Sequence, residues 1–235
     1  MVAMRIAVIT AAGQGTRVGH FLPKQFIKVG GSTIVEYSIK KFLEIGYDRV
    51  IVALPAKGFA TYRDLLTDDP RVDYIPGGLT ANESRYIGVS HAAGYIRDET
   101  TFAVVAVHDG VRPLFSPSIA IKCTRMCEND ANRAAVVPYI ETVETIRRPD
   151  GLYIRPVYER EVLWRLQTPM VFDLSRLNEA YERVVRNGTF ETYLTASDVY
   201  EAMYHDMRFV ESTVRNFKIT TADDLSMAAI LLTHE

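Results

Sequence analysis

The chain is poor in the features that mark several classes of protein. It has only two cysteines in 235 residues, and Cys123 and Cys127 lie four positions apart in a segment with helical spacing, which supports neither a disulfide framework nor a zinc site. Its 27 Lys and Arg residues are balanced by 29 Asp and Glu residues, without a basic run that could follow a nucleic acid backbone. The apolar stretch at 6–12 is too short to cross a bilayer. The sequence therefore disfavours nucleic acid and membrane partners and predicts a cytoplasmic protein.

Apolar runs and helical segments alternate along most of the chain. The length and the 48% of hydrophobic residues are typical of one globular α/β domain, so we expect residues 1–235 to form a single domain. Alternation of this kind predicts βαβ units and a doubly wound, mainly parallel sheet. The expected strands are 5–10, 49–54, 72–75, 102–107 and 134–137, with strand-like segments at 208–214 and 216–220; the expected helices are 34–45, 81–96, 119–128, 174–185, 197–203 and 222–232.

One segment interrupts this alternation. Residues 142–148 and 151–155 alternate apolar and polar side chains around Pro149-Asp150-Gly151, which is the pattern of a β-hairpin with turn residues in its middle. We expect residues 139–163, approximately, to form an arm that covers an active site or contacts a partner chain.

The first expected strand leads directly into a glycine-rich loop. Gly13 and Gly15 match the first two glycines of a dinucleotide fingerprint, but Val18 occupies the third position and no acidic residue follows the second strand, so a dehydrogenase is disfavoured. The loop also lacks the Gly-Lys-Ser/Thr ending of a P-loop. Two interpretations remain: a phosphate-binding turn built from backbone N–H groups, or a tight turn without a ligand.

Two cations follow this loop closely. Arg17 and Lys24 lie within eleven residues of the glycines, where they could clamp the phosphates of a nucleoside triphosphate. The segments Ala11-Ala-Gly-Gln-Gly-Thr-Arg17 and Leu22-Pro-Lys-Gln-Phe26 resemble the opening signature of the cytidylyltransferases that make CDP-methylerythritol or CDP-ribitol.

Further motifs of that family follow in order. They are Gly77-Gly78 with Ser84, His108-Asp109 with Arg112-Pro113, Glu141-Thr142, Arg160, Gln167-Thr168-Pro169 and Phe217-Lys218-Ile219-Thr220. The resemblance implies a Rossmann-like nucleotidyltransferase fold and a transfer of CMP from CTP to a polyol phosphate. It implies catalytic roles for Arg17, Lys24 and Lys218; nucleotide binding by Ala11, Ala12, Gly13, Gly15, Gly77, Gly78, Ser84 and Asp109; acceptor binding by Arg112, Thr142, Arg160 and Thr168; and Mg²⁺ at Asp109.

Some of these residues have an ordinary structural interpretation as well. Asp109 would pair with Arg112 in a surface turn, or bind a metal or ligand because it ends an apolar strand. His108 is expected to be a hydrogen-bonded structural histidine without a catalytic part. Arg160 would lie on a solvated face, or, as the resemblance implies, reach the acceptor phosphate of the other subunit in a homodimer.

The chain departs from the family pattern at several positions. Ala81 stands where the family has an arginine, and Ser197-Asp198 is all that remains of a Thr-Asp-Asp/Glu element. We expect 2-C-methyl-D-erythritol 4-phosphate as the acceptor, in isoprenoid biosynthesis. Ribitol 5-phosphate, in teichoic acid biosynthesis, is the first alternative, and a nucleotide-binding regulator without catalytic activity is the second.

Overall fold

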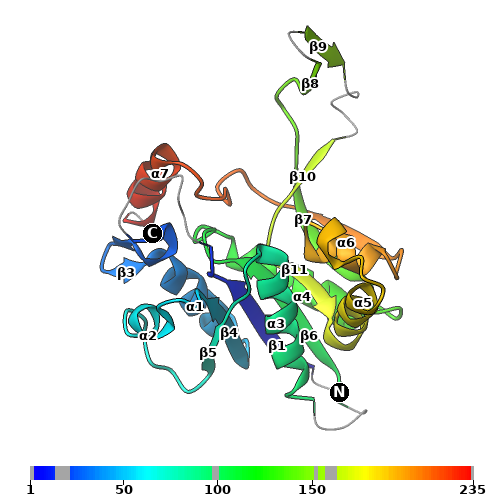
Figure 1. Cartoon of the computed structure of the whole chain (residues 1–235), viewed down its shortest axis with the longest axis horizontal. Coiled ribbons are helices and arrows are strands. Elements are labelled where there is room, and N and C mark those ends of the chain that lie inside the picture. Colours follow the sequence, from blue (N-terminus) through cyan, green and yellow to red (C-terminus); the bar gives the residue numbers. More distant parts are fainter. Residues whose placement is uncertain (1–2, 14–21, 97–100, 151–152, 157–162, 234–235) are drawn as a thin grey trace.

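The structure is a computed structural model, and it describes residues 3–13, 22–96, 101–150, 153–156 and 163–233. Its centre is an eight-stranded sheet in the order β10-β7-β11-β6-β1-β4-β5, with β12 paired to β7 (Figure 1). The strands of this sheet are β1 (Met4–Thr10), β4 (Arg49–Leu54), β5 (Val72–Pro76), β6 (Ala103–Asp109), β7 (Ala135–Glu141), β10 (Trp164–Leu166), β11 (Met170–Asp173) and β12 (Met207–Glu211).

Most neighbouring strands in the sheet are parallel. β1 pairs in parallel with β4 and β6, β4 with β5, and β7 with β12, which confirms the expected mainly parallel sheet. β10 and β11 are antiparallel to their neighbours, and the sequence pattern did not predict either strand. Since β11 is antiparallel to both β6 and β7, these two strands run in the same direction and their carboxyl ends lie at the same edge of the sheet.

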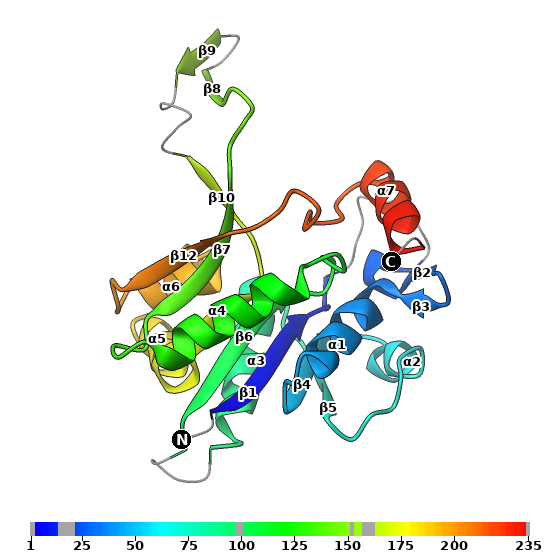
Figure 2. The ribbon, with the colours of Figure 1, turned by 180° about the vertical axis from the view of Figure 1, so that it is seen from behind.

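Helices cover both faces of the sheet. Ile6 and Val8 of β1 point to one face, where they pack with residues of α3, α5 and α6, while Ala7 and Ile9 point to the other, which α1 and α4 cover (Figures 1 and 2). Because helices cover both faces of β1, successive side chains on either face must be apolar, and the strand is a continuous apolar run. The helices are α1 (Ile34–Glu44), α2 (Phe59–Arg63), α3 (Ala81–Ala93), α4 (Pro117–Asn129), α5 (Leu174–Arg186), α6 (Ala196–Glu201) and α7 (Ala222–Leu232), with 3₁₀ turns η2 (Lys24–Phe26) and η4 (Phe190–Thr192).

A third, smaller apolar cluster lies where α7 meets the ribbon of β2 (Lys28–Val29) and β3 (Ser32–Thr33). The segment 216–220, which was expected to resemble a strand, forms no strand. Instead, Ile219 is fully buried in this cluster and its N–H donates to the Val111 carbonyl at 3.0 Å. The apolar side chains of this segment, Phe217 and Ile219, alternate because both pack against the cluster. The segment is not paired with a neighbouring strand along its length, so it is not a strand.

The predicted hairpin is present, with shifted bounds. β8 (Arg147–Asp150) pairs antiparallel with β9 (Tyr153–Pro156), and the ribbon stands away from the body beyond β7 and β10 (Figures 1 and 2). Pro149 and Asp150, which were expected in the turn, belong to β8. The arm therefore leaves the sheet at the carboxyl end of β7.

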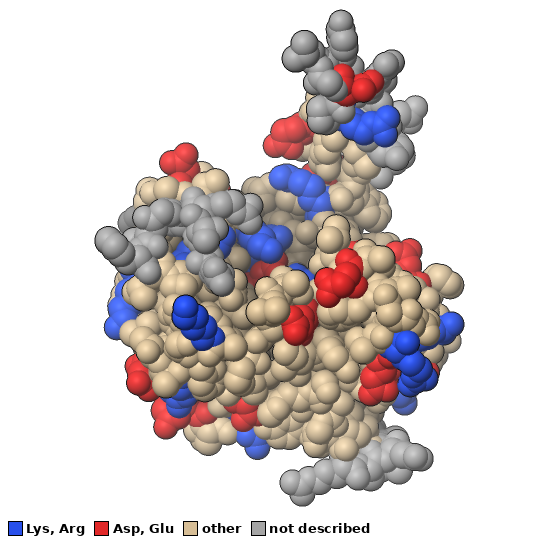
Figure 3. All heavy atoms as spheres, in the orientation of Figure 1, with Lys and Arg blue, Asp and Glu red and all other residues tan. Residues whose placement is uncertain are grey.

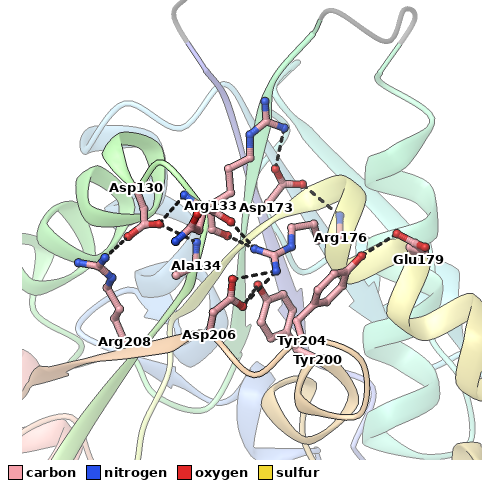
Figure 4. A network of polar contacts seen from close by, with 11 residues as sticks. Asp130, Arg133, Ala134, Asp173, Arg176, Glu179, Tyr200, Tyr204, Asp206 and Arg208 are labelled. Carbon is pink, nitrogen blue, oxygen red and sulfur yellow. Dashed lines mark hydrogen bonds and ion pairs between the residues drawn. The ribbon is translucent and has the colours of Figure 1, made fainter.

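A network of charged residues fixes the opposite end of β7 (Figure 4). Arg176 bridges the 132–133 carbonyls to Asp206, with nitrogen to oxygen distances between 2.5 and 3.1 Å. Asp130 pairs with Arg208, and Asp173 pairs with Arg133. These contacts join the turn before β7 to α5 and β12. They therefore stabilise the sheet at the edge opposite to the carboxyl ends of β6 and β7.

Candidate active site

A pocket of about 380 Å³ opens at the carboxyl ends of β1 and β6, where ligands bind in open α/β sheets. It brings together eight of the residues predicted from the sequence: Ala11, Ala12, Gly13, Lys24, Gly78, Ser84, Asp109 and Lys218. The other residues that line it are Thr10, Gln25, Leu79, Thr80, Ala81 and Val111.

The turn at 77–80 forms one wall of the pocket. A Cβ atom on Gly77 would lie 2.6 Å from Cβ of Ala12 and 2.9 Å from Oγ of Ser84, so only glycine lets this turn approach the first loop so closely. The Ser84 hydroxyl donates to the Thr80 carbonyl and accepts from the Gly78 N–H. Ser84 therefore shapes the turn, and its predicted contact with ribose or base stays a prediction.

Lys24 enters the pocket from a rigid support. It begins the η2 turn, whose Phe26 is buried and stacks on Tyr62 with ring centroids 4.5 Å apart. The Phe26 N–H donates to the Pro23 carbonyl and closes the turn. A lysine stem held in this way is well suited to place a charge at one position in the pocket.

Asp109 lies at the floor of the pocket among three cations. Its Oδ2 is 3.0 Å from Nε of Arg112 and 3.2 Å from Nζ of Lys218, and its Oδ1 is 3.6 Å from Nη2 of Arg85. Burial alone would raise the pKa of this carboxyl group, but the charges of Lys218, Arg112 and Arg85 outweigh burial and hold the pKa well below its ordinary value. Asp109 is therefore ionised at neutral pH.

His108 lies directly behind Asp109 and is fully buried. Its Nε2 contacts the Arg112 carbonyl and the Ser38 hydroxyl, each at 3.2 Å, and the carbonyl requires Nε2 to carry the proton. Nδ1 then accepts from the Thr168 hydroxyl at 3.0 Å, and the Thr168 oxygen accepts the Asp109 N–H at 3.1 Å. Burial lowers the pKa of His108 to about 3, so the ring is neutral, and the expectation of a structural, hydrogen-bonded histidine is confirmed.

The remaining predicted residues lie around the pocket, away from it, or outside the described part of the chain. Arg112 and Thr168 act on Asp109 as described above. Thr142 is buried at the root of the arm, where its N–H donates to the Leu163 carbonyl. Ser197 and Asp198 lie in the first turn of α6, and the Asp198 carboxylate completes a capping box by accepting from the N–H of the N-cap residue Thr195. Gly15, Arg17 and Arg160 lie outside the described residues.

Two residues of the site were missed by sequence reasoning. Arg85 is buried. Its Nη2 faces Asp109, and its Nη1 donates to the Leu194 carbonyl at 2.8 Å. It lies one helical turn after Ala81 on α3, and this spacing of four residues was the only signal that could have revealed it. Gln25 is the other: it lies in the segment 22–26, whose motif predicts a role for Lys24 but none for Gln25.

A divalent cation would find one carboxylate here. Asp109 is the sole Asp or Glu among the described pocket residues, and no group of three metal-binding side chains occurs in the described part of the chain. Mg²⁺ commonly binds through one or two carboxylates together with substrate phosphates. Among the described residues, Oδ1 of Asp109 has only the longer contact to Arg85. The residues therefore fit Mg²⁺ brought in with a triphosphate.

The face of the molecule drawn in Figure 3 shows no continuous track of one charge. On the face in Figure 3, Lys and Arg side chains are interspersed with Asp and Glu over both the body and the arm. Within the described ranges, no helix has the length and apolar character needed to span a membrane.

Comparisons with known proteins agree on one family. A sequence profile of the 2-C-methyl-D-erythritol 4-phosphate cytidylyltransferase family matches residues 5–234. Enzymes of that name from Phocaeicola vulgatus and Bacteroides fragilis are 32% and 33% identical to this chain; each alignment covers 97% of this chain and 99% of the relative. A crystal structure of the Francisella tularensis enzyme of that name superposes with a TM-score of 0.79 at 25% identity and covers 96% of this chain and 98% of its own.

Proposed function

Because the chain belongs to the 2-C-methyl-D-erythritol 4-phosphate cytidylyltransferase family, we propose that it transfers CMP from CTP to 2-C-methyl-D-erythritol 4-phosphate in the pocket around Asp109. The products are CDP-methylerythritol and pyrophosphate, a step of isoprenoid biosynthesis. The family match and the identity over nearly the full chain support this acceptor over ribitol 5-phosphate, and an enzyme over a regulator without activity.

The reaction joins two phosphates. An oxygen of the acceptor phosphate forms a bond to the α-phosphorus of CTP, and the bond from that phosphorus to the bridging oxygen of pyrophosphate breaks. The acceptor oxygen is already ionised at neutral pH, so the step needs no general base. The neutral, buried His108 is consistent with this requirement.

The observation that carries the proposal is the charge of the pocket. Lys24 and Lys218 line it, and Arg85 and Arg112 contact Asp109 at its floor; this is the one carboxylate among the described lining residues. Fixed cations stabilise charge that builds up on the phosphates in the transition state. We assign Lys24, with Arg17, to the α-phosphate, and Lys218 to the attacking oxygen.

The other site residues are assigned to the nucleoside of CTP, to the acceptor and to Mg²⁺. Gly77, Gly78 and Ser84 would hold the cytosine and ribose, while Arg112, Thr142, Thr168 and Arg160 would hold the acceptor. Asp109 would hold Mg²⁺, and the bound ion would neutralise part of the charge of the triphosphate. The chain itself keeps Asp109 ionised and fixed in orientation through Arg112 and Lys218.

We further propose that the protein is a homodimer. A two-stranded ribbon is at best marginally stable alone in water, and β8 with β9 stands away from the body. At the base of the arm, Trp164 stacks on Tyr139 with ring centroids 3.9 Å apart, and Phe209 packs against Trp164 at 5.3 Å. Trp164 and Phe209 are 45% and 41% exposed, so this aromatic group offers an apolar surface to a second copy.

We also propose that the protein is cytoplasmic, because of the state of its two cysteines. Cys123 and Cys127 are both buried free thiols, which agrees with the cytoplasmic location expected from the sequence.

The test is release of pyrophosphate from CTP with each polyol phosphate in turn. We expect turnover with 2-C-methyl-D-erythritol 4-phosphate and Mg²⁺, and turnover with D-ribitol 5-phosphate at least a hundredfold lower. Preference for ribitol 5-phosphate would reverse the acceptor assignment. Absence of pyrophosphate with either acceptor, while CTP still binds, would favour the regulator.

A further inference from the structure

One buried side chain, Gln25, binds two carbonyls at the start of the first loop, in residues 11–13. Nε2 of Gln25 donates to the carbonyl oxygens of Ala11 and Gly13, each at 2.6 Å. Because both partners are carbonyl oxygens, the group that faces them must be the amide NH₂. Gln25 is 2% exposed, so water does not compete strongly for these bonds.

The two bonds control the direction of a peptide group. In a trans peptide the N–H of one residue points opposite to the carbonyl of the residue before it. Fixing the Ala11 carbonyl on Gln25 therefore turns the Ala12 N–H away from Gln25. Ala12 lines the pocket, and within the part of the chain that the structure describes its N–H has no acceptor.

The support behind Gln25 is rigid. It is the middle residue of the η2 turn, between Lys24 and the stacked Phe26. On the other side, the Ala11 N–H is tied to the Ala53 carbonyl of β4 at 2.8 Å. Ala11 is thus held through its N–H by Ala53 and through its carbonyl by Gln25, so the adjoining Ala12 N–H is oriented before any ligand enters. A donor oriented in advance costs less on binding than one that must be ordered.

We infer that Gln25 is a positioning residue for the nucleotide: it holds the Ala11 and Gly13 carbonyls against its own amide group, and so leaves the Ala12 N–H, on the opposite side of the Ala11–Ala12 peptide, to face CTP. This inference rests on the proposed binding of CTP in this pocket. In this inference Gln25 does not contact the nucleotide itself; it orients the backbone, and the Ala12 N–H contacts the nucleotide.

The test measures CTP binding by calorimetry in the absence of acceptor, so that no turnover occurs, together with thermal unfolding. Gln25→Met keeps the length of the side chain and removes both donors. Gln25→Glu places carboxylate oxygens against two carbonyl oxygens, which would repel them. We expect Gln25→Met to weaken CTP binding by about tenfold, the loss of one to two net hydrogen bonds, and Gln25→Glu to weaken it further.

A second buried glutamine provides the matched control. Gln167 is 3% exposed and also donates to a backbone carbonyl, that of Thr213, but it does not line the pocket. Gln167→Met should lower the unfolding temperature by a similar amount and leave CTP affinity within twofold.

Three results would overturn the inference: CTP affinity of Gln25→Met within twofold of the wild type, equal losses of CTP affinity in the Gln25 and Gln167 variants, or tighter binding by Gln25→Glu than by Gln25→Met. A wild-type protein that does not bind CTP would instead refute the proposed function, and the inference with it.

Discussion

Replacing Asp109 by asparagine should destabilise the protein strongly, because it leaves three cations without their shared counter-charge. Asp109 is 7% exposed and pairs with Arg112, Lys218 and Arg85. Removing one partner of a buried pair typically costs about 3–5 kcal/mol. Lys218 is 41% exposed, so its pair is screened and contributes less, and most of the loss arises from Arg112 and Arg85. For a chain of this size, such a loss lowers the unfolding temperature by roughly 6–20 °C.

An exposed ion pair serves as the control. Nη2 of Arg63 lies 2.6 Å from Oδ1 of Asp68, which is closer than Arg112, Lys218 or Arg85 lies to Asp109, but the Asp68 side chain is 92% exposed. Asp68→Asn should change the unfolding free energy by less than about 1 kcal/mol. Urea unfolding followed by circular dichroism compares the two variants with the wild type. Equal effects of the two substitutions would refute the reasoning that burial, and not distance, sets the energy.

The pH dependence follows from the direction of the pKa shift. The pKa of Asp109 is lower in the folded protein than its ordinary value of about 3.9, so its contribution to stability is complete above that value and is lost as pH falls through the folded-state pKa. The stability difference between wild type and Asp109→Asn should stay constant between about pH 6 and pH 8. This difference should become smaller only in strongly acidic solution, where Asp109 is protonated. A difference that already declined at pH 6 would contradict a lowered pKa of Asp109.

Three further outcomes are expected. Lys24→Ala should lower turnover with CTP by about a hundredfold or more while the circular dichroism spectrum stays unchanged, because a fixed charge that stabilises a transition state is typically worth about 2.7–4 kcal/mol; turnover near the wild-type value would exclude Lys24 from the mechanism. Trp164→Glu should convert a dimer into a monomer in light scattering at micromolar concentration, since it places a charge in the exposed aromatic group; a wild-type monomer would refute the dimer itself. In competition assays CTP should be used far better than ATP or GTP, because a purine would leave buried polar groups of the narrow Gly77 turn unpaired; equal use of a purine nucleotide would refute the base assignment.

Much of the fold could be predicted because its signals are local. β1, β4 and β6 are continuous apolar runs that are buried on both faces, and α3 and α4 have the expected helical spacing. β11 escaped prediction because its four residues pass directly into α5, whose N-cap is Asp173, the last residue of that strand. An apolar run that short has no periodicity of its own, and its place between β6 and β7 depends on tertiary pairing.

The candidate site was predicted in part for a similar reason. Lys24, Asp109 and Lys218 follow loops or strand ends in recognisable motifs, so their types and positions point to a ligand. Arg85 is different: an arginine on a helix ordinarily faces solvent, and only the packing of α3 against the sheet turns it toward Asp109. Gln25 is likewise defined by two carbonyl oxygens about a dozen positions away, which no local pattern encodes.

The position of the arm follows from strand direction. β6 and β7 are parallel, so Asp109 at the end of β6 and Glu141 at the end of β7 lie at the same edge of the sheet. A hairpin inserted after β7 must therefore leave the body on the side where the pocket opens, and the chain returns through β10 to Thr168, whose hydroxyl contacts both His108 and the Asp109 N–H. The same insertion thus joins the surface proposed for a second copy to residues that orient the floor of the pocket. A partner that contacts the arm would act on the site through this short connection, which is the physical reason to expect assembly and catalysis to be linked in this protein.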